Sequence, residues 1–157
     1  MVSKGTCRDA GFTLIELVVV VTIIAVLSAL TAPAFTQLVA AQRIKGASSD
    51  LLSALTRARS EAIKRNTEVT LAPASAGQWQ QGWRIPNPAD TGNVLDDHGP
   101  LALLQVSGPD SIVYLANGRL KNAVAPAFQV SATGQTTVRC VRIDLSGRPQ
   151  QTAAACP

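Results

Sequence analysis

Aromatic side chains are scarce in this chain of 157 residues: they make up 4% of it, although 46% of the residues are hydrophobic. A core with so few rings has to be built from aliphatic side chains, mainly Val, Leu, Ile and Ala. The length favours a single domain. Charge is also limited, since the formal net charge is +4, which is too mild to indicate nucleic acid binding by itself.

Histidine is scarcer still, because His98 is the only one in the chain. A lone histidine excludes sites that need two. The adjacent Asp96 and Asp97 have no further ligands at metal-binding spacing, and no nucleophile and base can be paired around a second histidine. We therefore expect no enzyme activity, no metal and no cofactor, and we interpret this short acidic stretch as a solvated turn.

Charged residues are missing from a long stretch near the N-terminus. The run from Leu17 to Ala34 is uncharged and long enough to cross a bilayer as a helix of about 20 residues. One carboxylate, Glu16, lies at its start, where an ionised group costs about 2–3 kcal/mol and usually has a partner. Because Lys4 and Arg8 form a basic N-terminal region, the alternatives are a secretory signal peptide and a plain signal anchor. Neither alternative explains Glu16.

Residues 11–17, Gly-Phe-Thr-Leu-Ile-Glu-Leu, resemble the N-terminal signal of type IV pilins and of type II secretion pseudopilins. The resemblance implies that a prepilin peptidase cuts between Gly11 and Phe12 on the cytoplasmic side and methylates the new amino terminus. It also implies that Glu16 pairs with the amino terminus of a neighbouring subunit in an assembled filament. The partners expected from it are therefore other pilins or pseudopilins, the peptidase and the inner membrane.

The chain then divides into four parts. Residues 1–11 form a short basic leader, 12–34 a membrane and filament-core helix, 35–66 an amphipathic helix, and 67–157 a β domain. A basic leader stays in the cytoplasm. The expected location is thus the inner membrane, crossed once, with the β domain in the periplasm, and afterwards a pilus or pseudopilus.

The helical pattern continues beyond the apolar run. Ile44, Leu51, Leu55, Ala58 and Ala62 recur at helical spacing and predict one apolar face that lies on a sheet. We expect a bend at Pro33, which removes a backbone donor, and an end at Asn66. Residues 58–66, Ala-Arg-Ser-Glu-Ala-Ile-Lys-Arg-Asn, resemble the end of the long helix in the GspH/FimT family, which includes FimT and FimU.

From Thr67 onward, the alternation of apolar and polar residues predicts short strands. Glu68–Leu71 and Gln78–Ile85 are expected to form a hairpin on the helix, and Pro86–Pro100 is expected to be a loop. A second small sheet or meander is predicted from four later segments: Leu101–Val106, Ser111–Leu115, Phe128–Ser131 and Thr136–Leu145. The predicted fold class is α+β, a type IV pilin-like fold with a long N-terminal helix packed on a small antiparallel β domain.

Three cysteines are present, and Cys7 lies in the leader. Cys140 and Cys156 then remain as an even pair in an oxidising compartment, where they predict a disulfide, with two free thiols as the alternative. Such a bond is worth about 3 kcal/mol on the chain-entropy model. Alternation along the last strand places Cys140 on the outer face of the sheet, so the bond would strap the C-terminal tail across that face.

The resemblance implies two classes of function. The first is a minor pilin or pseudopilin that helps to initiate filament assembly at or near the tip, in a type IV pilus or, alternatively, as a GspH-type subunit in type II protein export. The second is DNA capture, because some FimT-like pilins bind double-stranded DNA during natural transformation near a Gly-Arg-x-Arg motif. Here Gly147 and Arg148 match that motif and Gln150 replaces its second arginine, while Arg139 and Arg142 lie close by. The alternative is that these arginines only solvate an outer sheet face.

Overall fold

The computed structural model describes residues 12–121 and 124–157, and within them it leaves out the side chains of residues 29–34 and 91. The chain forms two compact units, residues 1–38 and 39–157. One helix, α1, runs from Leu14 to Arg65 and belongs to both. The predicted leader, with Gly11 and the first cysteine, lies outside the described residues.

The end of α1 is set by Asn66, as predicted. This residue adopts a left-handed conformation with φ of 52°. The amide of Asn66 donates to the carbonyl of Ile63 at 3.3 Å, and the amide of Thr67 donates to the carbonyl of Ala62 at 3.2 Å. This bonding pattern is a Schellman motif, in which an asparagine can take the left-handed position that glycine usually fills. Helix α1 includes Pro33, so the proline does not end it, and the bend expected there stays a prediction.

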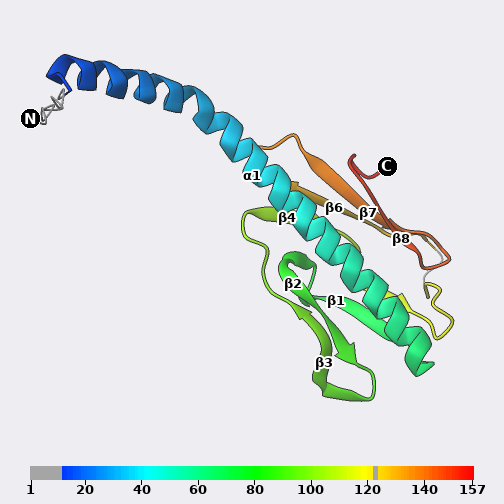
Figure 1. Cartoon of the computed structure of the whole chain (residues 1–157). Coiled ribbons are helices and arrows are strands. Elements are labelled where there is room, and N and C mark those ends of the chain that lie inside the picture. The colour runs from blue at the N-terminus through cyan, green and yellow to red at the C-terminus, as the bar shows by residue number, and fades with distance from the viewer. Residues whose placement is uncertain (1–11, 122–123) are drawn as a thin grey trace, which may run out of the picture. The chain divides into compact units, whose positions relative to one another are not determined.

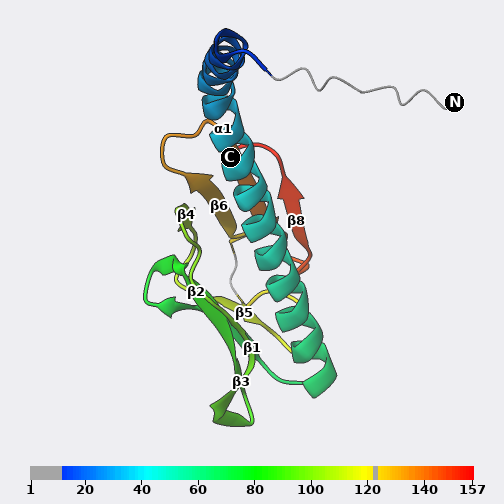
Figure 2. The same ribbon diagram turned by 60° about the vertical axis from the view of Figure 1, so that its left-hand side comes forward.

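The first sheet contains four antiparallel strands in the order β3-β2-β1-β5 (Figure 2). Their bounds are β1 Val69–Ser75, β2 Gln78–Asn87, β3 Asp90–His98 and β5 Ile112–Tyr114. The predicted hairpin of β1 and β2 is confirmed. A turn with Gly77 at φ of 70° joins the two strands, and this conformation is one that glycine adopts without steric cost.

The loop predicted from Pro86 to Pro100 was wrong, because most of it is strand β3. Trp83 pairs with His98 and Ile85 with Asp96 in the β2–β3 ladder. The pairing uses backbone groups, and β3 lies at an edge of the sheet, so its side chains need not alternate between apolar and polar. Its polar, turn-like composition therefore concealed the strand.

The second sheet has the order β4-β6-β7-β8 (Figure 1). Its strands are β4 Leu104–Ser107, β6 Ala127–Ala132, β7 Val138–Ile143 and β8 Pro149–Thr152. Strand β4 begins later than predicted, since Leu103 has a φ of 63° that an extended strand does not allow. Strand β5 joins the first sheet rather than the second. Strand β8 was not predicted as a strand, since its sequence Pro-Gln-Gln-Thr has no alternation of apolar and polar side chains.

The core of the second unit lies between α1 and both sheets. The predicted helix face is confirmed, since Ile44, Leu51, Leu55, Ala58 and Ala62 are fully buried. Trp79 of the first sheet meets Phe128 of the second edge-to-face, with ring centroids 4.8 Å apart. Edge-to-face packing is a favourable geometry for two aromatic rings, so this pair joins the two sheets at the centre of the domain.

One polar side chain is buried on the helix within this core. The hydroxyl of Ser48 accepts a hydrogen bond of 2.7 Å from the side-chain amide of Gln151 on β8, and it donates one of 2.9 Å to the carbonyl of Lys45. A buried hydroxyl without partners would cost free energy. The contact therefore fixes β8 in place against the helix.

Candidate functional site

The start of α1 carries the first group of predicted site residues. Thr13 and Glu16 bond reciprocally: the Glu16 amide donates to the Thr13 hydroxyl at 3.3 Å, and the Thr13 amide donates to a Glu16 carboxylate oxygen at 3.4 Å. This is a capping box, in which both residues satisfy helix-end donors that have no partner within the helix. In the single chain, the carboxylate of Glu16 is therefore occupied by its own helix.

Sequence reasoning missed Thr13, although its signal was visible. A threonine followed three residues later by glutamate, directly before an apolar run, is the usual signature of a capping box. The resemblance to the pilin signal includes this threonine but does not by itself give it a structural role. Its position gives the carboxylate of Glu16 a defined orientation before any partner subunit arrives.

The helix that follows the capping box has an exposed apolar surface. Large hydrophobic side chains from Leu14 to Leu27 are 46–80% exposed, and Phe12 is 81% exposed. A surface of this extent marks an interaction site. Among the residues whose side chains are described, which break off between Ser28 and Phe35, no helix is both long and apolar enough to span a membrane.

The second group lies at the C-terminal end of the chain. Cys140 and Cys156 form the predicted disulfide, with Cα atoms 5.0 Å apart. Cys140 lies on the outer face of the sheet, as alternation predicted, but its side chain is only 1% exposed. The tail covers it, and the amide of Cys156 donates to the side-chain carbonyl of Gln129 at 3.3 Å. The disulfide and the tail therefore bury Cys140 on that face.

The three arginines considered for DNA do not form one cluster. Strand β7 pairs with β8 so that Arg142 lies opposite Gln150, and the Asp144 amide donates to the Arg148 carbonyl at 3.1 Å. Arg142 and Arg148 thus share the face that carries Cys140, where they are diagonal neighbours. Arg139 lies opposite Val130, whose side chain belongs to the core, so Arg139 projects from the other face.

The Gly-Arg step of the motif has a structural role. Gly147 has a φ of 82°, and a Cβ atom there would overlap the carbonyl oxygen of Gly118. Arg59 of α1 forms a clamp on the turn that contains Gly118 and on the turn that contains Ser146 and Gly147. Its guanidinium donates to the carbonyl of Gly118 at 3.0 Å and to the carbonyl of Ser146 at 3.4 Å. The two turns and the helix therefore pack as one unit.

Asp144 and Tyr114 border the same clamp. The Ser146 hydroxyl and the Arg148 amide donate to the Asp144 carboxylate and hold its pKa below the ordinary value. Burial raises the pKa of Tyr114, and its hydroxyl has no partner among the described residues. Asp144 also faces Arg148 across the strand pair, so its negative charge offsets part of the positive charge on the outer face.

His98 is held at the edge of the first sheet by contacts with Trp83 and Asp50. Its ring stacks on Trp83 with centroids 4.1 Å apart, and its Nε2 atom is 3.5 Å from a carboxylate oxygen of Asp50 on α1. Arg57 binds Asp96 at 3.2 Å. Within the described part of the chain, no group of three or more His, Cys, Asp or Glu side chains is arranged to hold a metal ion.

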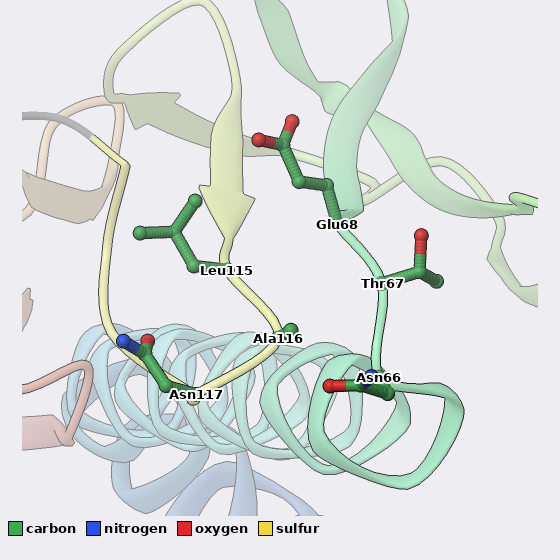
Figure 3. A pocket seen from close by; sticks show the side chains of 6 residues that line it. All are labelled: Asn66, Thr67, Glu68, Leu115, Ala116 and Asn117. Carbon is green, nitrogen blue, oxygen red and sulfur yellow. The ribbon is translucent and has the colours of Figure 1, made fainter.

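A shallow depression lies where α1 ends, lined by Asn66, Thr67, Glu68, Leu115, Ala116 and Asn117 (Figure 3). Glu68 is the only titratable side chain among these six residues, and it pairs with Lys121 at 2.8 Å.

Comparison with known proteins agrees with this description. The family model "Type II transport protein GspH" matches residues 47–147, and the model of the prokaryotic N-terminal methylation motif matches residues 6–32. Among solved structures, the type IV minor pilin FimU of Pseudomonas aeruginosa PAO1 is similar with a TM-score of 0.63 and 22% sequence identity, over 71% of this chain and 89% of FimU.

A second solved structure is the minor pseudopilin EpsH of the type 2 secretion system of Vibrio cholerae. It is similar with a TM-score of 0.56 and 12% identity, over 71% of this chain and 97% of EpsH. At these identities the likeness concerns the fold. No curated protein sequence matches the chain significantly.

A long helix that starts with a methylation motif and continues into a small antiparallel β domain defines a minor pilin or pseudopilin. The chain belongs to the GspH family. The α+β fold predicted from the sequence is confirmed.

Proposed function

We propose that this chain is a structural subunit, without enzyme activity, that helps to initiate assembly of a type IV pilus and lies near the tip of the filament. The observation that carries the proposal is the capping box of Thr13 and Glu16 at the head of an exposed apolar helix. A carboxylate held at a helix start, beside an exposed apolar surface, is suited to receiving the charged amino terminus of a neighbouring subunit.

The maturation steps are part of this proposal. Prepilin peptidase removes residues 1–11 and methylates Phe12, and the apolar helix holds the subunit in the inner membrane, with the β domain in the periplasm. The match of residues 6–32 to the methylation motif supports this order of events. The disulfide of the β domain supports an oxidising compartment on that side of the membrane.

The alternative is a GspH-type subunit of a type II secretion system, and the description of the matching family favours it. The C-terminal disulfide favours the pilus, by resemblance to the FimT and FimU members. Deleting the gene separates the two. Loss of surface pili with normal protein export supports the pilus, whereas normal pili with accumulation of export substrates in the periplasm would show that the secretion role is the correct one.

DNA binding is a second candidate function, and it is favoured by the two arginines that share the outer face of β7 and β8. Nonspecific binding to duplex DNA needs clustered positive charge and weakens as salt rises, because each phosphate contact releases counterions. Titration of labelled duplex with the full chain in detergent tests this. Arg142→Glu and Arg148→Glu should weaken binding, whereas Arg139→Glu on the opposite face should have a smaller effect. No binding at low salt would exclude the DNA role.

A further inference from the structure

The two sheets end in four edge strands, β3, β5, β4 and β8. An uncovered edge exposes backbone groups that pair readily with another strand, so proteins usually protect such edges. Strand β5 is protected by the segment that follows it, since the Lys121 amide donates to the carbonyl of Val113 at 3.0 Å and Leu120 forms a bridge with Tyr114. Strand β4 is covered differently, because it packs against β2 of the other sheet.

Strand β3 is protected by charge and irregularity. It carries Asp90, Asp96 and Asp97, and its register with β2 shifts on both sides of Pro86. If another strand paired with β3, these carboxylates would lose part of their hydration. An irregular edge also does not match a regular partner strand. This edge therefore resists pairing.

Strand β8 has neither kind of protection. Residues 149–157, Pro-Gln-Gln-Thr-Ala-Ala-Ala-Cys-Pro, contain no charged side chain. The strand is the last in its sheet, as Figure 2 shows, and it pairs regularly with β7 on one side. Pro149 lacks a backbone amide, but it protects only the first position of the strand.

The direction of the backbone groups of β8 follows from its pairing. The turn bond from the Asp144 amide to the Arg148 carbonyl makes Arg148, Gln150 and Thr152 the residues whose backbone groups face β7. The amide and carbonyl of Gln151 point the other way. Among the described residues, no backbone acceptor outside the strand ladders takes a bond from this amide.

We propose that the outer edge of β8, at Gln151, is a docking site for an extended strand, without basic side chains, of another pilin-type subunit in the filament. This inference rests on the proposed function, which supplies such neighbours. Backbone hydrogen bonds would provide the affinity, as in other cases where a strand is added to a sheet. Arg142 and Arg148 lie on the outer face of β7 and β8, so a partner strand with basic side chains on that face would meet like charges.

The helix holds this edge ready for a partner. The side chain of Gln151 donates to the buried hydroxyl of Ser48, while the disulfide fixes the chain beyond Thr152. The edge is therefore anchored before a partner arrives. An anchored strand loses less conformational entropy when it pairs.

Gln151→Pro tests the proposal, because proline removes the outward amide but no bond to β7. The matched control, Gln151→Ala, also loses the contact with Ser48 but keeps the amide. Full-length variants are expressed in the native filament-forming cells, and the sheared filament fraction is assayed for the subunit. We expect about tenfold less Gln151→Pro than wild type, the effect of losing a hydrogen bond or two, and near-normal amounts of Gln151→Ala.

Equal amounts of both variants in the filament would overturn the proposal. Thermal melts and disulfide content of the full chain in detergent verify that both variants fold. Absence of the wild-type protein from the filament fraction would instead contradict the proposed function. A dimer of the purified full chain in detergent that Gln151→Pro abolishes would show that the edge binds a second copy, and this too would overturn the proposal.

Discussion

Thr13 and Glu16 cap the first turn of α1 together, each accepting from the backbone amide of the other. The contact gives Glu16 a role in the isolated subunit. Under the proposed function, a carboxylate that leaves this box to bind a neighbouring amino terminus exchanges one hydrogen bond for an ion pair. Assembly would then compete with a cap that is typically worth about 1 kcal/mol.

The cap can be tested at Thr13. Thr13→Val keeps the shape of the side chain but removes the hydroxyl that accepts from the Glu16 amide. The first turn should fray, and the amide of Glu16 should exchange hydrogen several-fold faster in detergent, as expected for a loss of about 1 kcal/mol. Thr22→Val is the control, since its hydroxyl only bonds the carbonyl of Val18 within the helix. Equal exchange in the two variants would contradict the capping role.

Processing is a separate prediction. We expect the membrane-extracted protein to begin at Phe12 and to carry one added methyl group, because residues 6–32 match the methylation motif. Intact-mass measurement determines this directly. A chain that still begins at Met1 in cells with active prepilin peptidase would show that the cleavage assignment is incorrect.

The close packing at Gly147 predicts that an alanine there destabilises the domain more than an alanine at Gly134 does. Gly147→Ala should destabilise the domain by about 2–4 kcal/mol, because its Cβ overlaps the Gly118 carbonyl and its φ is positive. Gly134→Ala should cost only about 1 kcal/mol, since its φ of 73° is similar but its Cβ meets nothing within 4 Å. Urea unfolding gives both values. Similar losses would mean that the clamp does not constrain the domain.

The carboxylate of Asp144 predicts a pH dependence. Its pKa is lower in the folded chain than the ordinary value of 3.8. The folded state therefore binds fewer protons, so Asp144 stabilises the domain above that value and loses its effect as pH falls through the lower folded pKa. Asp144→Asn should narrow the difference in melting temperature between pH 6 and strongly acidic solution. An unchanged difference would argue against the contribution of Asp144.

Much of this fold was predictable because local physics fixed it. The spacing of Ile44, Leu51 and Leu55 defined the buried helix face, and Asn66 was recognisable as its end. The cysteine pair followed from composition and compartment. These features depend on single residues or on one element, so they can be read from the chain alone.

Other features depend on partners that are distant in sequence. Strand β3 is held by backbone bonds to β2, and its polar side chains gave no sign of this pairing. Strand β5 belongs to the first sheet because it pairs with β1, and the sequence of β5 does not show which strand it will pair with. For Cys140, alternation predicted the correct face, but the tail that buries it crosses from further along the chain. The separation of Arg139 from Arg142 follows from alternation and was available from the sequence.

Glu16 carries the central claim, that its carboxylate serves filament assembly. The most direct measurement is the amount of full-length Glu16→Ala in sheared filaments, relative to wild type, with membrane extraction and the melting temperature of the β domain as checks. The account predicts that the variant is membrane-inserted, folded and processed, and that it is missing from the filament. Glu16→Ala present in the filament at the wild-type amount would contradict the account.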